Sequence, residues 1–297
     1  MVAARERLAQ FVEGSEHLTA LCRAYRNECT VVHLSELVGG AWAFYAAAAV
    51  ARVGGVHVFV AEDRDAAAYL LNDFYNLLDE ERVCFFPSSF KRSVAYGAED
   101  AQGVVQRTAT LNALKNFSSD YLVVCTYPEA LAERVADVET FQRDTIAVHV
   151  GDRIDIDDLV QLLADASFSC VDFVYEPGQY SVRGGIVDVF SFSESKPYRL
   201  DFFGSEVDSI RRFNISSQLS SEKLTEVEII PDLNGRAAVS APKISLARFA
   251  GAGAAFWFYD IDHVLRRVND VRRKTLADME HPEEIDTLVT CRYGLVT

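Results

Sequence analysis

The stretch from Glu176 to Gln218 constrains the fold of this chain more than any other part. It reads EPGQYSVRGGIVDVFSFSESKPYRLDFFGSEVDSIRRFNISSQ, and apolar and polar residues alternate along it with a period of two. The alternation stops and restarts at Gly184-Gly185, at Pro197 and at Gly204. This pattern predicts an antiparallel meander of strands with one buried face and one face toward solvent.

Two features of the meander do not fit a purely structural sheet. Arg183 directly precedes the Gly184-Gly185 turn, and Phe202 and Phe203 are adjacent on one predicted strand. Because successive strand side chains point to opposite faces of a sheet, one of the two phenylalanines must leave the core.

The first 147 residues alternate strand signals with helix signals. Continuous apolar runs are typical of buried parallel strands, and Asp63 is well placed to cap a helix of regular apolar spacing. The predicted strands are Thr30–Leu34, Val56–Ala61, Val83–Phe86 and Tyr121–Thr126. Strands that alternate with helices indicate a parallel sheet covered on both faces, so we expect an α/β domain over residues 1–147.

A second domain is predicted over residues 148–231, where a helix at Ile156–Ala166 leads into the meander. The change from apolar runs to clean alternation marks the boundary. Residues 232–297 carry an apolar run and a helix, and we expect this segment to pack on the first domain. The predicted fold class is α/β, a parallel-sheet domain followed by a small α+β meander domain. Because no closing element follows the last apolar pair, we expect a fragment of a longer chain.

The acidic balance of the chain argues against nucleic acid as a direct partner. The formal net charge is −15, and the 29 lysines and arginines form no sustained stripe. The densest basic group, Arg266–Lys274, has the spacing of a solvated helix face. Since non-specific nucleic-acid affinity comes mainly from clustered Lys and Arg, we do not expect this chain alone to bind DNA.

Three further patterns concern the compartment. The longest apolar run, Ala41–Ala51, is shorter than the ~18–20 residues of a membrane span. The N-terminus begins with charges and helix formers rather than with a signal peptide. The six cysteines are scattered without close pairs. We therefore expect a cytoplasmic protein with no membrane contact and no disulfide framework.

A strand–glycine–helix arrangement occupies the place of a phosphate-binding loop. Gly39 and Gly40 supply the glycines, but the bulky Trp42 follows them and no lysine precedes Lys91. A working loop needs a Lys for the phosphates and a Ser or Thr for magnesium. A helix N-terminus can attract an anion, yet the pattern favours a tight turn into a packed helix. We expect no cofactor and no ATP hydrolysis at this degenerate loop.

Other candidate chemistry is equally sparse. The six histidines show no paired metal-ligand spacing, and His57 within an apolar run is typical of a core histidine. The acidic group Asp155–Asp158 opens a helix, where carboxylates favour the helix dipole. Ser88 and Ser89 have no partnered base that the sequence identifies. The sequence predicts no catalytic residue and no metal site.

What remains is the solvent face of the meander, where Arg183, Arg199 and Asp201 fall on the strands beside Phe203. Arginine forks and exposed aromatic side chains are typical of protein interfaces. The alternative is that Arg199 and Asp201, two residues apart on one face, simply pair with neighbouring strands. The residues alone leave both interpretations open.

The meander segment, together with VCFFPSSFKR and TYPEALAERV in the first domain, resembles sequences shared by the bacterial repair helicase subunit UvrB and the transcription-repair coupling factor Mfd. The resemblance implies a helicase-like first domain and a small domain that docks onto UvrA. Arg183, Arg199 and Phe203 take the positions of UvrA-contacting residues, and Asp201 sits where an acidic residue supports them. Phe203 is therefore the phenylalanine expected to face outward. Ser181 departs from the second arginine that UvrB-type sequences often have.

The degenerate loop selects the coupling factor over UvrB, because UvrB carries a working phosphate loop there. The implied function is recruitment of UvrA in nucleotide excision repair, by the N-terminal module of an ATP-dependent DNA translocase. Contacts with RNA polymerase and DNA would lie in domains beyond residue 297, and a distal domain of the parent could mask the UvrA surface. The alternatives are a divergent UvrB-like helicase fragment that retains nucleotide binding at Gly39–Trp42, and a purely structural or autoinhibitory domain.

Overall fold

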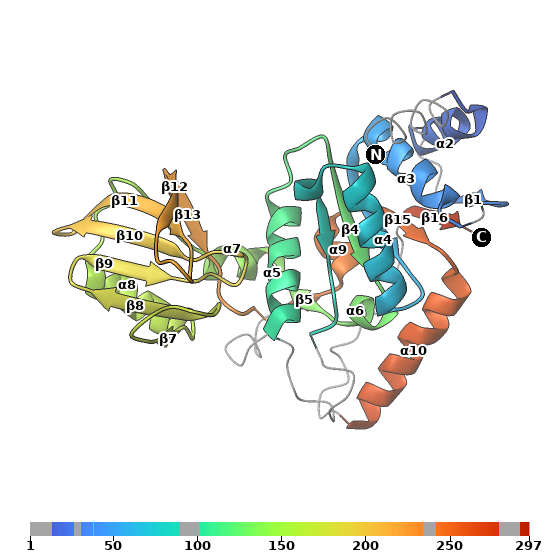
Figure 1. Cartoon of the computed structure of the whole chain (residues 1–297). Coiled ribbons are helices and arrows are strands. Elements are labelled where there is room, and N and C mark those ends of the chain that lie inside the picture. The colour runs from blue at the N-terminus through green and yellow to red at the C-terminus, as the bar shows by residue number, and fades with distance from the viewer. Residues whose placement is uncertain are drawn as a thin grey trace. The chain divides into compact units, whose positions relative to one another are not determined.

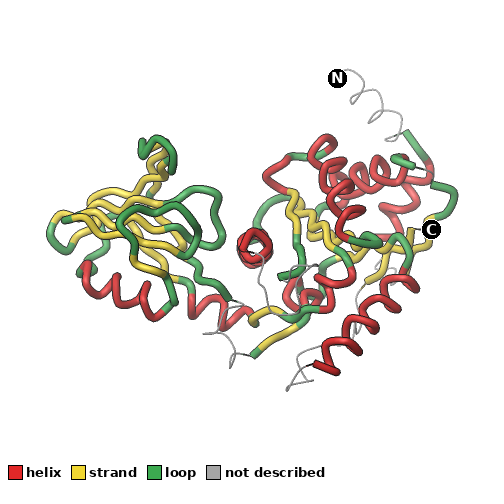
Figure 2. The backbone as a smooth tube through the Cα atoms, turned by 60° about the horizontal axis from the view of Figure 1, so that its bottom comes forward, coloured by secondary structure: helices red, strands yellow, loops and turns green. Residues whose placement is uncertain are grey.

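The chain folds into two compact units. A computed structural model describes residues 14–26, 31–37, 39–89, 101–233, 242–278 and 292–296. Unit 1 comprises Met1–Tyr96, Thr110–Val135 and Lys243–Thr297, and unit 2 comprises Gly97–Ala109 and Ala136–Pro242. Figure 1 shows the elements of both units with their labels, and Figure 2 shows the same backbone coloured by secondary structure.

Unit 1 is built on a six-stranded sheet in which every pair of neighbouring strands is parallel. Its strands, in sheet order, are β1 (Val31–Leu34), β16 (Arg292–Val296), β15 (Ala255–Phe258), β2 (Gly55–Val60), β4 (Tyr121–Thr126) and β3 (Val83–Phe85). Its helices are α2 (Glu16–Arg26), α3 (Ala41–Val53), α4 (Arg64–Leu77), the 3-10 turn η1 (Glu80–Arg82), α6 (Pro128–Ala132), α9 (Leu246–Ala250) and α10 (Ile261–Asp278). The short strand β14 (Lys243–Ile244) also belongs to unit 1, while α5 (Ala101–Lys115) and β5 (Val135–Ala136) run across the division of the chain.

The parallel sheet follows from its strand sequences, as predicted. All six residues of β4 are buried, and so are the last five of β2, which explains their uninterrupted apolar runs. The helix after β2 begins as expected, because the Asp63 side chain accepts a hydrogen bond from the amide of Ala66 at 2.9 Å. Strand β15, from the last part of the chain, lies between β16 and β2 in the interior of the sheet.

Unit 2 contains the predicted meander. Its sheet runs β12 (Ser220–Leu224), β11 (Glu206–Phe213), β10 (Tyr198–Phe203), β9 (Ile186–Val189), β8 (Gln179–Arg183) and β7 (Ser169–Cys170). Neighbours are antiparallel except for β7 and β8. A separate antiparallel pair joins β6 (Ile146–His149) to β13 (Glu226–Ile229), and the helices are α7 (Val138–Asp144) and α8 (Ile156–Asp165).

Strand β12 has no strand signal in the sequence, because the stretch after Gln218 is polar. The strand lies at the edge of the sheet, and four of its five residues are exposed. An edge strand without a buried face has no apolar alternation to detect, and its charged residues are typical of protected sheet edges.

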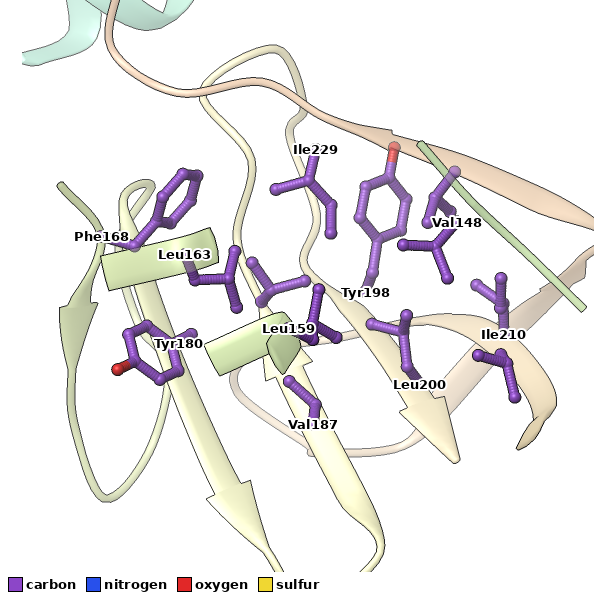
Figure 3. Close-up of a cluster of buried hydrophobic side chains, with 13 residues drawn as sticks. Val148, Leu159, Leu163, Phe168, Tyr180, Val187, Tyr198, Leu200, Ile210 and Ile229 are labelled. Carbon is purple, nitrogen blue, oxygen red and sulfur yellow. The ribbon is translucent and has the colours of Figure 1, made fainter. Parts of the chain in front are cut away.

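One face of the meander sheet packs on α8. Figure 3 shows Leu159 and Leu163 of α8 among side chains from the strands, including Val187 and Leu200, and all four are fully buried. The core cluster consists of Val148, Leu159, Leu163, Phe168, Tyr180, Val187, Val189, Tyr198, Leu200, Val207, Ile210, Val227 and Ile229. Because this face is covered, the polar residues that alternate with it occupy the opposite face.

A β-bulge adjusts the alternation where the two phenylalanines lie. Asp201 faces Ser209 across the β10–β11 pair, but the next residue, Phe202, faces Val207. Asp208 is the extra residue in β11, so Val207 and Ile210, three apart, both reach the core. The hairpin closes at Gly204, whose φ of 64° suits the first position of a two-residue turn.

Candidate functional site on the outer face of the meander sheet

The face of the sheet opposite α8 carries two rows of cross-strand neighbours. The first row, from β8 to β12, is Ser181, Asp188, Arg199, Arg211 and Lys223. The second row, from β8 to β11, is Arg183, Ile186, Asp201 and Ser209. We call these nine residues the outer face. They include four cations but only two carboxylates, in a chain whose net charge is −15.

Asp188 joins two of the predicted site residues. Arg199 binds it with both arms of its guanidinium, Nε to Oδ1 at 2.7 Å and Nη2 to Oδ2 at 2.8 Å. Arg183 donates to the same Oδ2 from its Nη2. Asp188 is 1% exposed, whereas the side chains of Arg183 and Arg199 are 35% and 16% exposed. The hydrogen bonds and charge of Asp188 raise the pKa of Arg199, which stays protonated at any physiological pH.

Each of these arginines also lies over an aromatic ring. The guanidinium carbon of Arg199 is 4.5 Å from the ring centre of the buried Phe213, and that of Arg183 is 5.0 Å from the ring centre of Phe173. Arg199 Nη1 further donates to the carbonyl of Gln218 at 3.4 Å. The two guanidinium planes are therefore held by a carboxylate and by a ring.

Asp201 pairs with Arg211, whereas Arg183 and Arg199 pair with Asp188. It accepts a hydrogen bond from Ser209 Oγ at 2.8 Å and forms an ion pair with Arg211. The interpretation that Arg199 and Asp201 pair with neighbouring strands thus describes their contacts correctly. These pairs lie on the solvent face, so the same contacts are compatible with an interface.

Of the two adjacent phenylalanines, Phe203 faces solvent and Phe202 packs against the core. Phe203 is 84% exposed at the end of β10, two residues beyond Asp201 on the same strand. The prediction of its outward orientation is confirmed. An aromatic side chain this exposed next to a cationic surface has the chemistry of an interface anchor.

The sequence reasoning missed Asp188, Arg211 and Phe173 as members of this surface. A signal for Asp188 was present in the sequence, because it interrupts the apolar run Ile186–Phe190 on a strand in the interior of the sheet. A carboxylate in such a position needs a cation, and arginines lay on both neighbouring strands. Nothing comparable marked Phe173, which precedes β8 in an irregular segment.

The degenerate loop of unit 1 leads into a helix whose Trp42 packs among aromatic rings. Trp42, in the first turn of α3, lies with its ring centre 6.1 Å from that of Phe59, 6.5 Å from that of Phe74 and 6.4 Å from that of Tyr259. Gly40 precedes the helix without a side-chain cap. The arrangement corresponds to the expected tight turn into a packed helix.

The other residues considered as candidate sites are buried, lie in a helix turn or are held by hydrogen bonds within the fold. His57 is buried, and Asp157 and Asp158 lie in the first turn of α8. The hydroxyl of Ser89 donates to Glu133 Oε2 at 2.8 Å, as does its amide at 3.0 Å. Within the described residues, no group of three or more His, Cys, Asp or Glu side chains could hold a metal ion. The helices of that same part of the chain include none with the length and apolar content of a membrane span.

Comparison with known proteins finds a family model and a group of relatives that match the chain. Residues 146–234 match the family model described as the UvrB interaction domain. The chain is 25% identical over 226 residues to the transcription-repair-coupling factor of Bacillus subtilis, covering 76% of this chain and 19% of that protein. It is 29% identical over 206 residues to the Escherichia coli factor, covering 67% and 17%, and 27% identical over 165 residues to that of Haemophilus influenzae, covering 56% and 14%.

These matches confirm the resemblance to transcription-repair coupling factors and to UvrB. The chain spans less than a fifth of the length of the relatives it matches. The family-model match covers all nine residues of the outer face and Phe203.

Proposed function

We propose that this chain is the UvrA-recruiting module of a transcription-repair coupling factor. In this proposal the outer face of the meander sheet docks onto UvrA, with Phe203 as apolar anchor and with Arg183, Arg199 and Asp201 beside it. The module itself is non-catalytic. The parent protein is an ATP-dependent DNA translocase that acts on stalled RNA polymerase in nucleotide excision repair, through domains other than this one.

The observation that carries the proposal is the exposure of Phe203 next to an ordered arginine pair, inside a region that matches the UvrB interaction domain. A benzyl side chain that is 84% exposed gains little in the isolated fold. Burial of apolar area contributes roughly 25 cal/mol per Å², so a partner pocket for Phe203 would stabilise a complex substantially.

The charge of the outer face suits an acidic partner surface. The outer face carries four cations and two carboxylates. One of the carboxylates, Asp188, is buried beneath Arg183 and Arg199. Complementary potential increases association rates and fixes the register of docking. A surface with more cations than carboxylates is unusual on a chain that is acidic overall.

The non-catalytic part of the proposal is supported by Trp42. Its ring contacts Phe59, Phe74 and Tyr259 beside the loop that would have to hold phosphates, and neither Lys nor Ser/Thr is present in that loop.

Binding of purified UvrA to the chain, measured by calorimetry, tests the proposal. We expect Phe203→Ala combined with Arg199→Ala to weaken binding by at least about a hundredfold, since anchors and their charged neighbours are commonly worth 2 kcal/mol or more each. The matched control is Tyr69→Ala combined with Arg143→Ala, which removes an aromatic that is 75% exposed and an exposed arginine elsewhere. Undiminished binding by the Phe203/Arg199 variant would refute the site.

A further inference from the structure

We infer that Asp188 is the positioning residue of the docking surface, holding Arg183 and Arg199 in one arrangement before UvrA arrives. The inference rests on the proposed docking function. Asp188 would not touch the partner itself, because it is 1% exposed and lies beneath both arginines.

The hydrogen-bonding capacity of Asp188 is directed to the two arginines. Oδ1 accepts from Arg199 Nε, and Oδ2 accepts from Nη2 of Arg199 and Nη2 of Arg183. The cross-strand neighbour on the other side, Ser181, is buried, and its hydroxyl has no hydrogen-bond partner among the described residues. Asp188 therefore links strands β8, β9 and β10 through arginines alone.

Because Asp188 is buried, its carboxylate needs the arginine partners. An ionised carboxylate removed from water is costly unless it is paired and hydrogen-bonded, so the guanidinium groups are drawn to Asp188. The Arg199 and Arg183 guanidinium groups also lie over the rings of Phe213 and Phe173. Carboxylate and ring together restrict side chains that would otherwise sample many rotamers.

Restricting the rotamers of Arg183 and Arg199 would preorganise the surface for docking. An arginine that is already ordered loses less conformational entropy when it meets a partner group. Arg183 contacts Asp188 through Nη2, and its Nε and Nη1 have no hydrogen-bond partners among the described residues, so each of these two nitrogens can donate to a partner group. A guanidinium held in this way can donate charge-assisted hydrogen bonds to a carboxylate of the partner.

The Asp188→Asn variant of the full chain tests the inference with purified UvrA. We expect about tenfold weaker binding that appears in the dissociation rate, because removal of a negative charge from a cationic face does not slow association with an acidic surface. The Nε–Hε NMR signal of Arg199 should lose its protection from exchange. The matched control is Glu222→Gln, which removes one of the two carboxylate partners of Arg212, on the same sheet but outside the outer face.

A double-mutant cycle separates positioning from general structural support. If Asp188 acts through the arginines, Asp188→Asn should have no further effect on affinity once Arg183 and Arg199 are both alanine. The effect of Phe203→Ala should be the same in the Asp188→Asn background as in the wild type. An equal loss from Asp188→Asn in the presence and absence of the arginines would overturn the inference.

A second variant covers the case in which Asp188→Asn does not fold. Arg199→Lys keeps the charge but cannot make the two-armed contact, so we expect it to weaken binding by a similar factor. If Arg199→Lys binds like the wild type while Phe203→Ala and Arg199→Ala bind weakly, the positioning role fails and the docking function stands. If none of the variants weakens binding, the docking function itself fails.

Discussion

Trp257 Nε1 donates a hydrogen bond to Nδ1 of His57 at 3.0 Å, joining neighbouring strands β15 and β2 in the core of unit 1. The other ring nitrogen of His57, Nε2, donates to the carbonyl of Gly54 at 3.0 Å. These two contacts define a neutral imidazole with its proton on Nε2. Desolvation accordingly lowers the pKa of His57 from 6.5 to about 4.

The stability of unit 1 should therefore decrease as the pH falls from about 6.5 to about 4. In that window the unfolded chain binds a proton at His57 and the folded chain does not, so the stabilisation present above pH 6.5 is progressively lost. Between pH 7 and pH 5 we expect His57 to account for about 2 kcal/mol of lost stability. Urea unfolding of the wild type and of His57→Gln measures it, with the exposed His149→Gln as control. Equal pH dependence in wild type and His57→Gln would contradict the prediction.

Replacement of Gly185 by alanine should disturb the end of β10. A Cβ atom at this position would lie 2.9 Å from the carbonyl oxygen of Phe202, closer than real side chains approach. We expect a loss of stability of about 1–3 kcal/mol and a displaced β10 end, so that binding through Phe203 also weakens. Thermal unfolding and UvrA binding measure the two effects. Gly253→Ala, where the Cβ atom meets open space, should change neither.

Truncation of side chains on the two faces of α8 should destabilise the protein to different extents. Leu159 is fully buried against the meander sheet, and Leu159→Ala should cost about 2–5 kcal/mol through lost contacts and a residual cavity. Leu162 on the same helix is 44% exposed, and its alanine variant should cost less than about 1 kcal/mol. Denaturant unfolding of unit 2 distinguishes them. Similar losses in the two variants would mean that α8 does not cover the sheet as described.

ATP should not bind at the degenerate loop. A nucleotide would find neither a lysine for its phosphates nor a Ser or Thr for magnesium in the segment Leu37–Trp42. Calorimetric titration with Mg-ATP at millimolar concentration should give only heats of dilution. A saturable heat that disappears in a Gly40→Val variant would support the helicase-like alternative instead.

Local patterns in the sequence were sufficient to predict the meander and several strands of the parallel sheet. The period-two alternation of residues 176–218 predicted the meander, and the apolar runs of β2 and β4 predicted the parallel sheet. Both patterns reflect which side chains are buried. Alternation marks a strand with one buried face, and a continuous apolar run marks a strand buried on both faces. The same alternation placed Phe203 and Phe202 on opposite faces, and the exposure of Phe203 agrees with it.

Pairing between distant strands was beyond the reach of these patterns. The pairing of β6 with β13 joins segments nearly eighty residues apart, and β12 lacks a buried face that alternation could reveal. The extra residue Asp208 in β11 likewise has no sequence mark, because a bulge is defined by the partner strand.

The sequence by itself determined that an arginine-containing meander with an outward phenylalanine exists, and that the phosphate loop lacks its functional residues. Only the tertiary structure decided which charges meet. It placed Asp188 beneath Arg183 and Arg199, and it gave Asp201 to Arg211 instead. The physical reason is that strand faces follow from local periodicity, whereas ion pairs depend on cross-strand register, which long-range packing sets.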